Sequence, residues 1–199
     1  DYGWDTLVEH IQGPMVRCVS DIGLAMKVLS GSDDRDPSSM PNDGMDFCKA
    51  ALGTQNLEGR RIAYAGNIGG VIPLDKEVEK LVKSGAYAFE NLGCEVKDAC
   101  FDASDIQDII TGTRGFGMVA RYAERYDKYQ HLMTPQLINQ VSAALDLSVR
   151  DVVRSERLRT AYWHKIRKFM TNFDYIIAPV VGAPPFRLDE PLPTQVGGV

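Results

Sequence analysis

Apolar residues at helical spacing mark the first regular element of the chain. Four of them recur three or four positions apart, namely Val19, Ile22, Met26 and Leu29. This period predicts an α-helix over residues 19–30 with one buried stripe. The following stretch, GSDDRDPSSMP, contains one glycine and two prolines, which interrupt regular structure. A second, short helix is expected around DFCKAALG at residues 46–53.

Three short, largely apolar segments predict the strands of a sheet. They are RRIAYA at 60–65, CEVKDACF at 94–101 and DYIIAPVV at 174–181. Helical patterns separate them, and parallel strands require such crossovers. The near-continuous apolar run of the third segment is typical of a sheet covered on both faces. The predicted class is therefore α/β, with a parallel or mixed sheet covered by helices and with Ile62, Val96 and Ile176 buried.

Polar residues at the ends of the helical patterns predict where the helices begin and end. Asp75 is a plausible N-cap for the helix between the first two strands, and Gly93 suits its C-terminal stop. Ser148 and Asp151 have the spacing of a capping box. A long, mostly helical region is expected over 104–173, with turns near HLMTP and before Ser148.

Composition narrows the class of protein further. The 199 residues suffice for one domain, and 44% hydrophobic with 25% charged residues is ordinary for a globular protein. A net charge of −5 gives no general attraction to nucleic acid or anionic membranes, and no apolar run approaches the roughly 20 residues that span a bilayer. The four cysteines are too sparse for a disulfide framework. We therefore expect a cytoplasmic protein with no membrane or nucleic-acid partner.

Three segments closely resemble the amidase signature family. The first, GPMVRCVSDIGLAMKVLSGSDDRDP at 13–37, is similar to the segment that follows the catalytic core of that family. The second, at 57–96, resembles the family's strand–helix–strand unit, and the third, YWHKIRKFMTNFDYIIAPVVGAPP, resembles its aromatic-rich helix and following strand. Cys18 stands where the family usually has a threonine N-cap.

The resemblance implies hydrolysis of a small carboxamide by a Ser–cis-Ser–Lys triad. We expect no metal and no cofactor. In the family that triad lies in a Gly/Ser-rich segment upstream of the first of these motifs, so no catalytic residue is assigned here. We expect one incomplete domain, a partial amidase fold lacking the catalytic N-terminal half. It would consist of connecting helices at 1–58, an α/β lobe at 59–180 and a truncated Pro-rich segment at 181–199. Both ends of the chain look cut, and no activity is expected from it alone.

The same resemblance points to three substrate-binding residues. In the family, the variable helical region corresponding to residues 105–145 shapes the acyl or leaving-group pocket. Phe116, Met118 and Tyr122 are candidates for that wall by position and character. Ordinary helix packing explains them equally well.

Other motifs carry competing interpretations. The adjacent pair Ser38–Ser39 lacks flanking glycines and is read as loop structure rather than a nucleophile. AGNIGG lacks the dinucleotide fingerprint, and TGTRGFG follows no strand, so we expect a strand-exit loop and a relaxed or bent helix. One helical stripe is basic and is read as a solvated face rather than a nucleic-acid site; it comprises Arg150, Arg154, Arg157, Lys165 and Lys168. The histidines share no metal-ligand spacing; they are His10, His131 and His164.

A different class of protein also fits these features. The chain could be a non-catalytic α/β interaction module, or a companion chain that completes an amidase supplied elsewhere. The reading frame upstream of Asp1 distinguishes this from the amidase portion. For the amidase portion we expect a homo-oligomer formed through an exposed sheet edge or through the helix over 19–29, whereas a clean monomer would favour the module.

Overall fold

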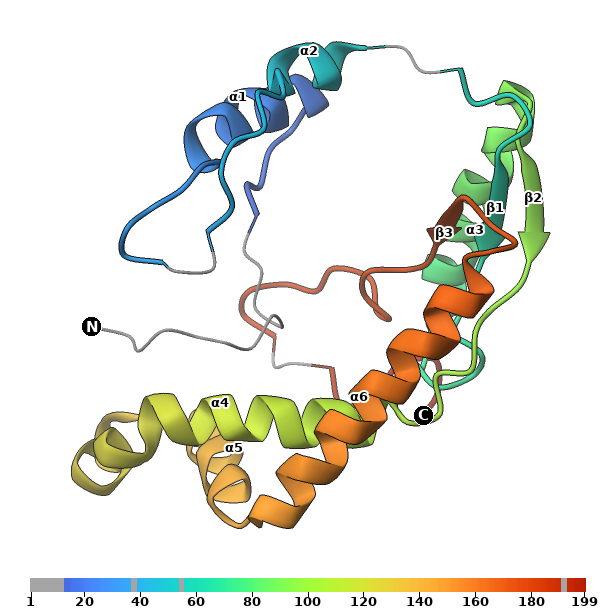
Figure 1. The fold of residues 1–199 in the computed structure, drawn as a ribbon. Helices are drawn as coiled ribbons and strands as arrows, with labels where there is room; N and C mark the ends of the chain where they lie inside the picture. The colour runs from blue at the N-terminus through green and yellow to red at the C-terminus, as the bar shows by residue number, and fades with distance from the viewer. Residues whose placement is uncertain (1–12, 37–38, 54–55, 191–192) are drawn as a thin grey trace. The chain divides into compact units, whose positions relative to one another are not determined.

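The computed structural model describes residues 13–36, 39–53, 56–190 and 193–199 (Figure 1). The chain divides into two compact units. One contains the described residues up to Asn56 together with Thr113–Leu147, and the other contains Leu57–Gly112 and Ser148–Val199. The expected division of one domain at residues 58 and 180 stays a prediction.

A small parallel sheet forms the centre of the unit that contains Leu57–Gly112. Its strands are β1 (Arg61–Tyr64), β2 (Glu95–Asp98) and β3 (Tyr175–Ile177), in the order β2-β1-β3 (Figure 1). Ile62 of β1 is opposite Val96 on one side and Tyr175 on the other. The predicted α/β class is confirmed. β3 ends earlier than predicted, before Pro179, which has no N–H to donate to a neighbouring strand.

The helix between β1 and β2 begins where its cap predicts. Asp75 accepts a hydrogen bond from the Glu77 amide (2.8 Å) at the start of α3 (Lys76–Tyr87). The last turns tighten into the 3-10 helix η1 (Ala88–Leu92), and Gly93 follows with φ of 81°. That left-handed backbone favours glycine, so the predicted stop is confirmed.

The core of this unit lies between α3 and one face of the sheet. Its buried residues are Ile62, Tyr64, Ala86, Cys94 and Val96. Ile177 packs against this cluster, whereas Ile176 is only half-buried. Successive strand residues point to opposite faces, and β3 is an outer strand of the sheet that the described residues form, so Ile176 lies at an edge on the face away from α3. The expectation that Ile176 is buried was wrong.

Helix α6 (Val149–Phe169) leads into β3. The predicted capping box is confirmed: the Asp151 amide donates to Ser148 Oγ (3.2 Å), and the Ser148 amide donates to Asp151 Oδ2 (2.9 Å). Phe101, which follows β2, makes edge-to-face ring contacts with Tyr162 and Phe169 of α6. Aromatic contacts therefore attach α6 to the segment beyond β2.

The other unit is helical. It contains α1 (Val19–Leu29), α2 (Phe47–Leu52), η2 (Gln130–Leu132) and α5 (Pro135–Leu145), and α4 (Ile106–Tyr129) belongs to it from Thr113 onward. Both predicted N-terminal helices are confirmed. The predicted buried stripe of α1 is not, because Val19 is 62% and Leu29 is 66% exposed. The buried residue of α1 is Gly23, against the Phe47 carbonyl of α2.

The glycines of TGTRGFG allow close packing, whereas the sequence predicted that they relax or bend the helix. Helix α4 runs without interruption through Gly112 and Gly115. A Cβ at Gly112 would overlap Ser155 of α6, and one at Gly115 would overlap Leu147. These positions therefore need glycine because a neighbouring segment occupies the space of a side chain.

None of the described helices is both long and apolar enough to cross a membrane.

Candidate functional site

The carboxyl ends of the three strands are where a parallel sheet most often binds ligands. The loop after β1 begins at Ala65, whose amide donates to the Ile177 carbonyl of β3 (2.9 Å). Asn67 Oδ1 accepts from the Gly70 amide (2.8 Å), and Ile68 has a φ of 53°. A β-branched residue in that region of backbone space is uncommon, so internal hydrogen bonds hold this loop in a defined turn.

This loop does not have the geometry of a nucleotide-binding turn. A phosphate site of that kind needs a helix that starts directly after the loop, with unpaired amides. Helix α3 starts only at Lys76, and the Asp75 carboxylate already accepts from its first turn. The structure favours the strand-exit interpretation of AGNIGG.

A polar cluster joins the ends of β1 and β2 to α3. Lys83 Nζ donates to Asp98 Oδ2 (2.9 Å) and lies 5.7 Å from the centre of the Tyr64 ring and 5.8 Å from that of Tyr87. The Tyr87 hydroxyl donates to the other oxygen of Asp98 (3.1 Å). The hydrogen bond to Asp98 raises the pKa of Lys83 and lowers the pKa of Asp98. Lys83 therefore keeps its proton.

Lys165 of α6 is held in the same way. Its Nζ donates to Asp102 Oδ2 (2.7 Å) and to Asp105 Oδ2 (2.8 Å), and these bonds raise the pKa of Lys165. Its hydrogen bond to Asp102 lowers the pKa of that carboxyl group. A lysine base in nucleophilic catalysis must be neutral. The carboxylates beside Lys83 and Lys165 instead favour the protonated, charged form of each lysine.

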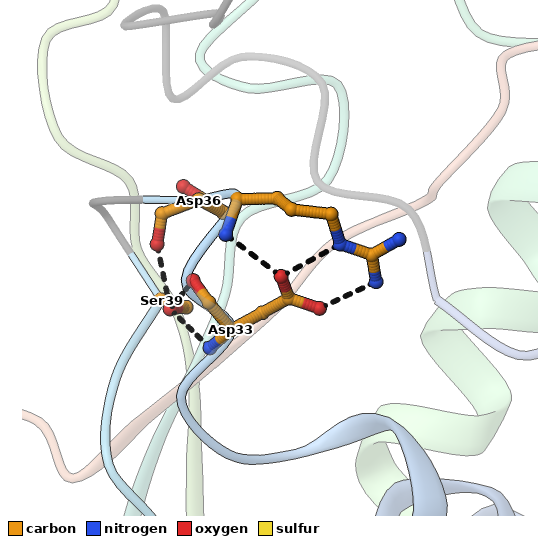
Figure 2. A network of polar contacts seen from close by, with 4 residues as sticks. Asp33, Asp36 and Ser39 are labelled. Carbon is orange, nitrogen blue, oxygen red and sulfur yellow. Dashed lines mark hydrogen bonds and ion pairs between the residues drawn. The ribbon is translucent and has the colours of Figure 1, made fainter.

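The loop after α1 forms the polar network of Figure 2. Arg35 donates two hydrogen bonds to the Asp33 carboxylate, at 2.9 Å from Nε and 2.7 Å from a terminal nitrogen. The Ser39 hydroxyl donates to the Asp36 carbonyl (2.6 Å) and accepts from the Asp33 amide (2.8 Å) (Figure 2). Backbone groups thus bind the Ser39 hydroxyl, as loop structure requires and a nucleophile does not. Ser38 and His10 lie outside the described residues.

The three predicted pocket residues lie on two sides of α4. Met118 is buried against Val141 and Ala144 of α5, and Tyr122 packs on the same cluster. Phe116 is 50% exposed. Residues two positions apart on a helix point about 200° apart, so Phe116 does not share the face of Met118. Their role in binding substrate stays a prediction.

The predicted basic stripe divides into paired and exposed residues. Lys165 turns to Asp102 and Asp105, and Arg154 donates to Asp108 Oδ2 (2.7 Å). Arg150 and Arg157 remain on the exposed side of α6.

Sequence reasoning missed the cluster of Lys83, Tyr87 and Asp98. The signal available to it was the i, i+4 spacing of Lys83 and Tyr87 before a strand that ends in an acid. That spacing does not determine which strand end lies next to this face of α3. As for metals, the described part of the chain holds no group of three or more His, Cys, Asp or Glu side chains suited to an ion.

Comparisons with known proteins place the chain in a family. The Amidase family model matches residues 6–198, so the chain belongs to the amidase family. It is 25% identical to the acylamidase of Rhodococcus erythropolis, over 94% of this chain and 39% of that protein. It is also 26% identical to the amidase of Pseudomonas putida, over 94% of this chain and 40% of that protein.

Solved structures give the same assignment. A bacterial aryl acylamidase of the amidase signature family superposes with a TM-score of 0.77 at 27% identity, over 94% of this chain and 40% of that one. A 6-aminohexanoate cyclic dimer hydrolase shares the fold, with a TM-score of 0.64 at 20% identity, over 85% and 37% of the two chains. The chain thus spans about two fifths of the length of these relatives.

Proposed function

We propose that this chain is the portion of an amidase that follows the catalytic segment, in an enzyme that hydrolyses the C–N bond of a small carboxamide. The observation that carries the proposal is the match to the amidase family over residues 6–198 combined with coverage of about two fifths of the relatives. The protonated states of Lys83 and Lys165 support it, since neither supplies the neutral base that the chemistry needs.

In this proposal the catalytic groups act from outside the 199 residues. A neutral lysine would accept the nucleophilic serine's proton through a bridging serine, and backbone amides would hold the oxyanion. This chain would supply one wall of the pocket. Phe116 is the predicted wall residue whose exposed ring is available to an acyl or aryl group, while Met118 and Tyr122 support α4 from the α5 side.

The proposal predicts a difference between two polypeptides. The whole polypeptide that contains these residues should hydrolyse anilides or aliphatic amides, and one of its serines should react with a fluorophosphonate probe. The 199-residue chain alone should do neither, because the proposal places the activated serine outside it. Release of amine and intact-mass labelling measure the two properties.

Two results would contradict the proposal. Stoichiometric labelling of a serine in the 199-residue chain would mean that the chain holds its own nucleophile. An upstream reading frame without a Gly/Ser-rich serine motif would favour the companion-chain alternative.

We also assign the protein to the cytoplasm, which its four free cysteines support.

We further propose that the 199-residue chain associates with itself. Val28 of α1 is 79% exposed, and Val19, Leu24 and Leu29 of the same helix are also exposed. In addition, β2 and β3 are the outer strands of the described sheet. Exposed apolar faces and strand edges of this kind commonly pair with a second copy.

Sedimentation tests this association. The chain at roughly micromolar concentration should sediment as a dimer or larger species of its 22.0 kDa unit, because self-association buries the α1 face. Val28→Asp should shift it toward monomer, whereas Leu188→Asp, also at an exposed site, should not. A clean monomer that binds no hydrophobic dye would refute this interface.

A further inference from the structure

The outward side of the first half of α6 combines arginines with apolar residues. Arg150, Val153, Arg154, Arg157 and Leu158 line a hollow of about 510 Å³, and we call these residues the arginine face. Their spacing of three and four positions places them along one side of the helix. Val153 is 52% exposed although it is apolar. The hollow is therefore lined by both guanidinium groups and apolar side chains.

The positive charge of this face is only partly compensated. Arg154 donates to Asp108 (2.7 Å). Of the other acids of the same helix segment, Asp151 accepts from Ser148 and is also attracted by the charges of Arg150 and Arg154, and Glu156 pairs with Arg159 (2.6 Å). In the described part of the chain, neither Arg150 nor Arg157 takes part in a salt bridge. The guanidinium of Arg157 thus has no ion-pair partner among the described residues, and that of Arg150 is balanced only through its weaker attraction to Asp151.

We propose that the arginine face is a docking site for an acidic, amphipathic segment of a partner protein. Arg150 and Arg157 lie two helical turns apart, about 10 Å along the axis, so two carboxylates on one side of such a segment can reach both. Each guanidinium can bind a carboxylate through two parallel hydrogen bonds. An apolar side chain between those carboxylates would cover Val153, and arginine is among the residues enriched at interface hot spots.

The apolar part of the lining is what favours a protein over a nucleic acid. Phosphate backbones are bound by basic groups and hydroxyls, and bases by aromatic stacking. Val153 and Leu158 offer neither. This proposal is independent of the amidase activity.

Binding of a defined probe to the whole polypeptide tests the site. The probe is a fluorescent peptide of about 14 residues with glutamates on one helical face and leucines between them, measured by anisotropy. We expect saturable binding that Arg157→Glu weakens at least about tenfold, since reversal turns attraction into like-charge repulsion. Lys80→Glu, the same charge change at an exposed position of α3, should leave the affinity unchanged.

Two further probes separate this site from other binding modes. A peptide with serines in place of the leucines keeps the charge and should bind more weakly, and Val153→Asp should remove the difference between the two peptides. Circular dichroism confirms that each variant is folded. Arg157→Lys is a second, milder variant, because it keeps the positive charge and removes only the guanidinium group. Equal affinity for both peptides, no binding, insensitivity to Arg157→Glu, or tighter binding of single-stranded poly(dT) would each overturn the proposal.

Discussion

Ile62→Ala is expected to lower the free energy of unfolding by about 2–5 kcal/mol, the range for large-to-small changes in a packed core. Ile62 is 2% exposed and lies on the central strand, between Val96 of β2 and Tyr175 of β3. It belongs to the cluster that joins the sheet to α3, so its loss leaves a cavity with little room to collapse. Urea titration followed by circular dichroism measures the change.

Ile176→Ala is the matched control for that experiment. It removes the same atoms from the neighbouring strand, but Ile176 is half-buried at the edge. Because the hydrophobic contribution scales with the area removed from water, its effect should be clearly smaller. Equal losses for the two variants would show that the outer face of β3 is covered as completely as the α3 face.

Gly112→Ala is expected to destabilise the protein, although alanine is the better helix former. The new Cβ would overlap Ser155 of α6 and lie 3.3 Å from the Asp151 carbonyl. Forcing two packed helices apart costs about 1–3 kcal/mol, which exceeds or cancels the gain of about 1 kcal/mol in helix propensity. The thermal midpoint of the variant should therefore fall.

Gly85→Ala provides the opposite expectation within the same protein. Gly85 lies inside α3, and a Cβ added there would have no atom within 4 Å, so alanine should stabilise by about 0.5–1 kcal/mol. A second variant, Gly112→Ala with Ser155→Gly, should recover part of the loss because it removes the overlapping atoms. A Gly112→Ala protein as stable as Gly85→Ala would mean that α4 and α6 do not pack closely here.

The two lysine clusters bear on chemistry as well as on stability. Lys83 and Lys165 each bind carboxylates at the ends of strands or at the start of α4, where they hold elements together. Their raised pKa values keep them charged at neutral pH. A neutral lysine requires burial or neighbouring cations instead. The ion pairs of Lys83 and Lys165 therefore connect α3 to β2 and α6 to the segment before α4.

The sequence by itself determined the elements whose signals are local. Asp75 caps α3, Ser148 and Asp151 cap α6, and Gly93 ends η1, because each of these residues acts on backbone groups within four positions. The order of strands and helices likewise predicted a parallel sheet, and the motifs around Gly13 and in β3 predicted the amidase family.

Only the tertiary structure decided which residues meet across long separations in the chain. It placed Ile176 at an edge, exposed most of the expected stripe of α1, and brought Lys83 to Asp98. It also showed that Gly112 makes room for Ser155, which lies 43 positions further along the chain. Helical period and strand alternation define faces, but which face is covered depends on what packs against it. That partner is set by the fold as a whole.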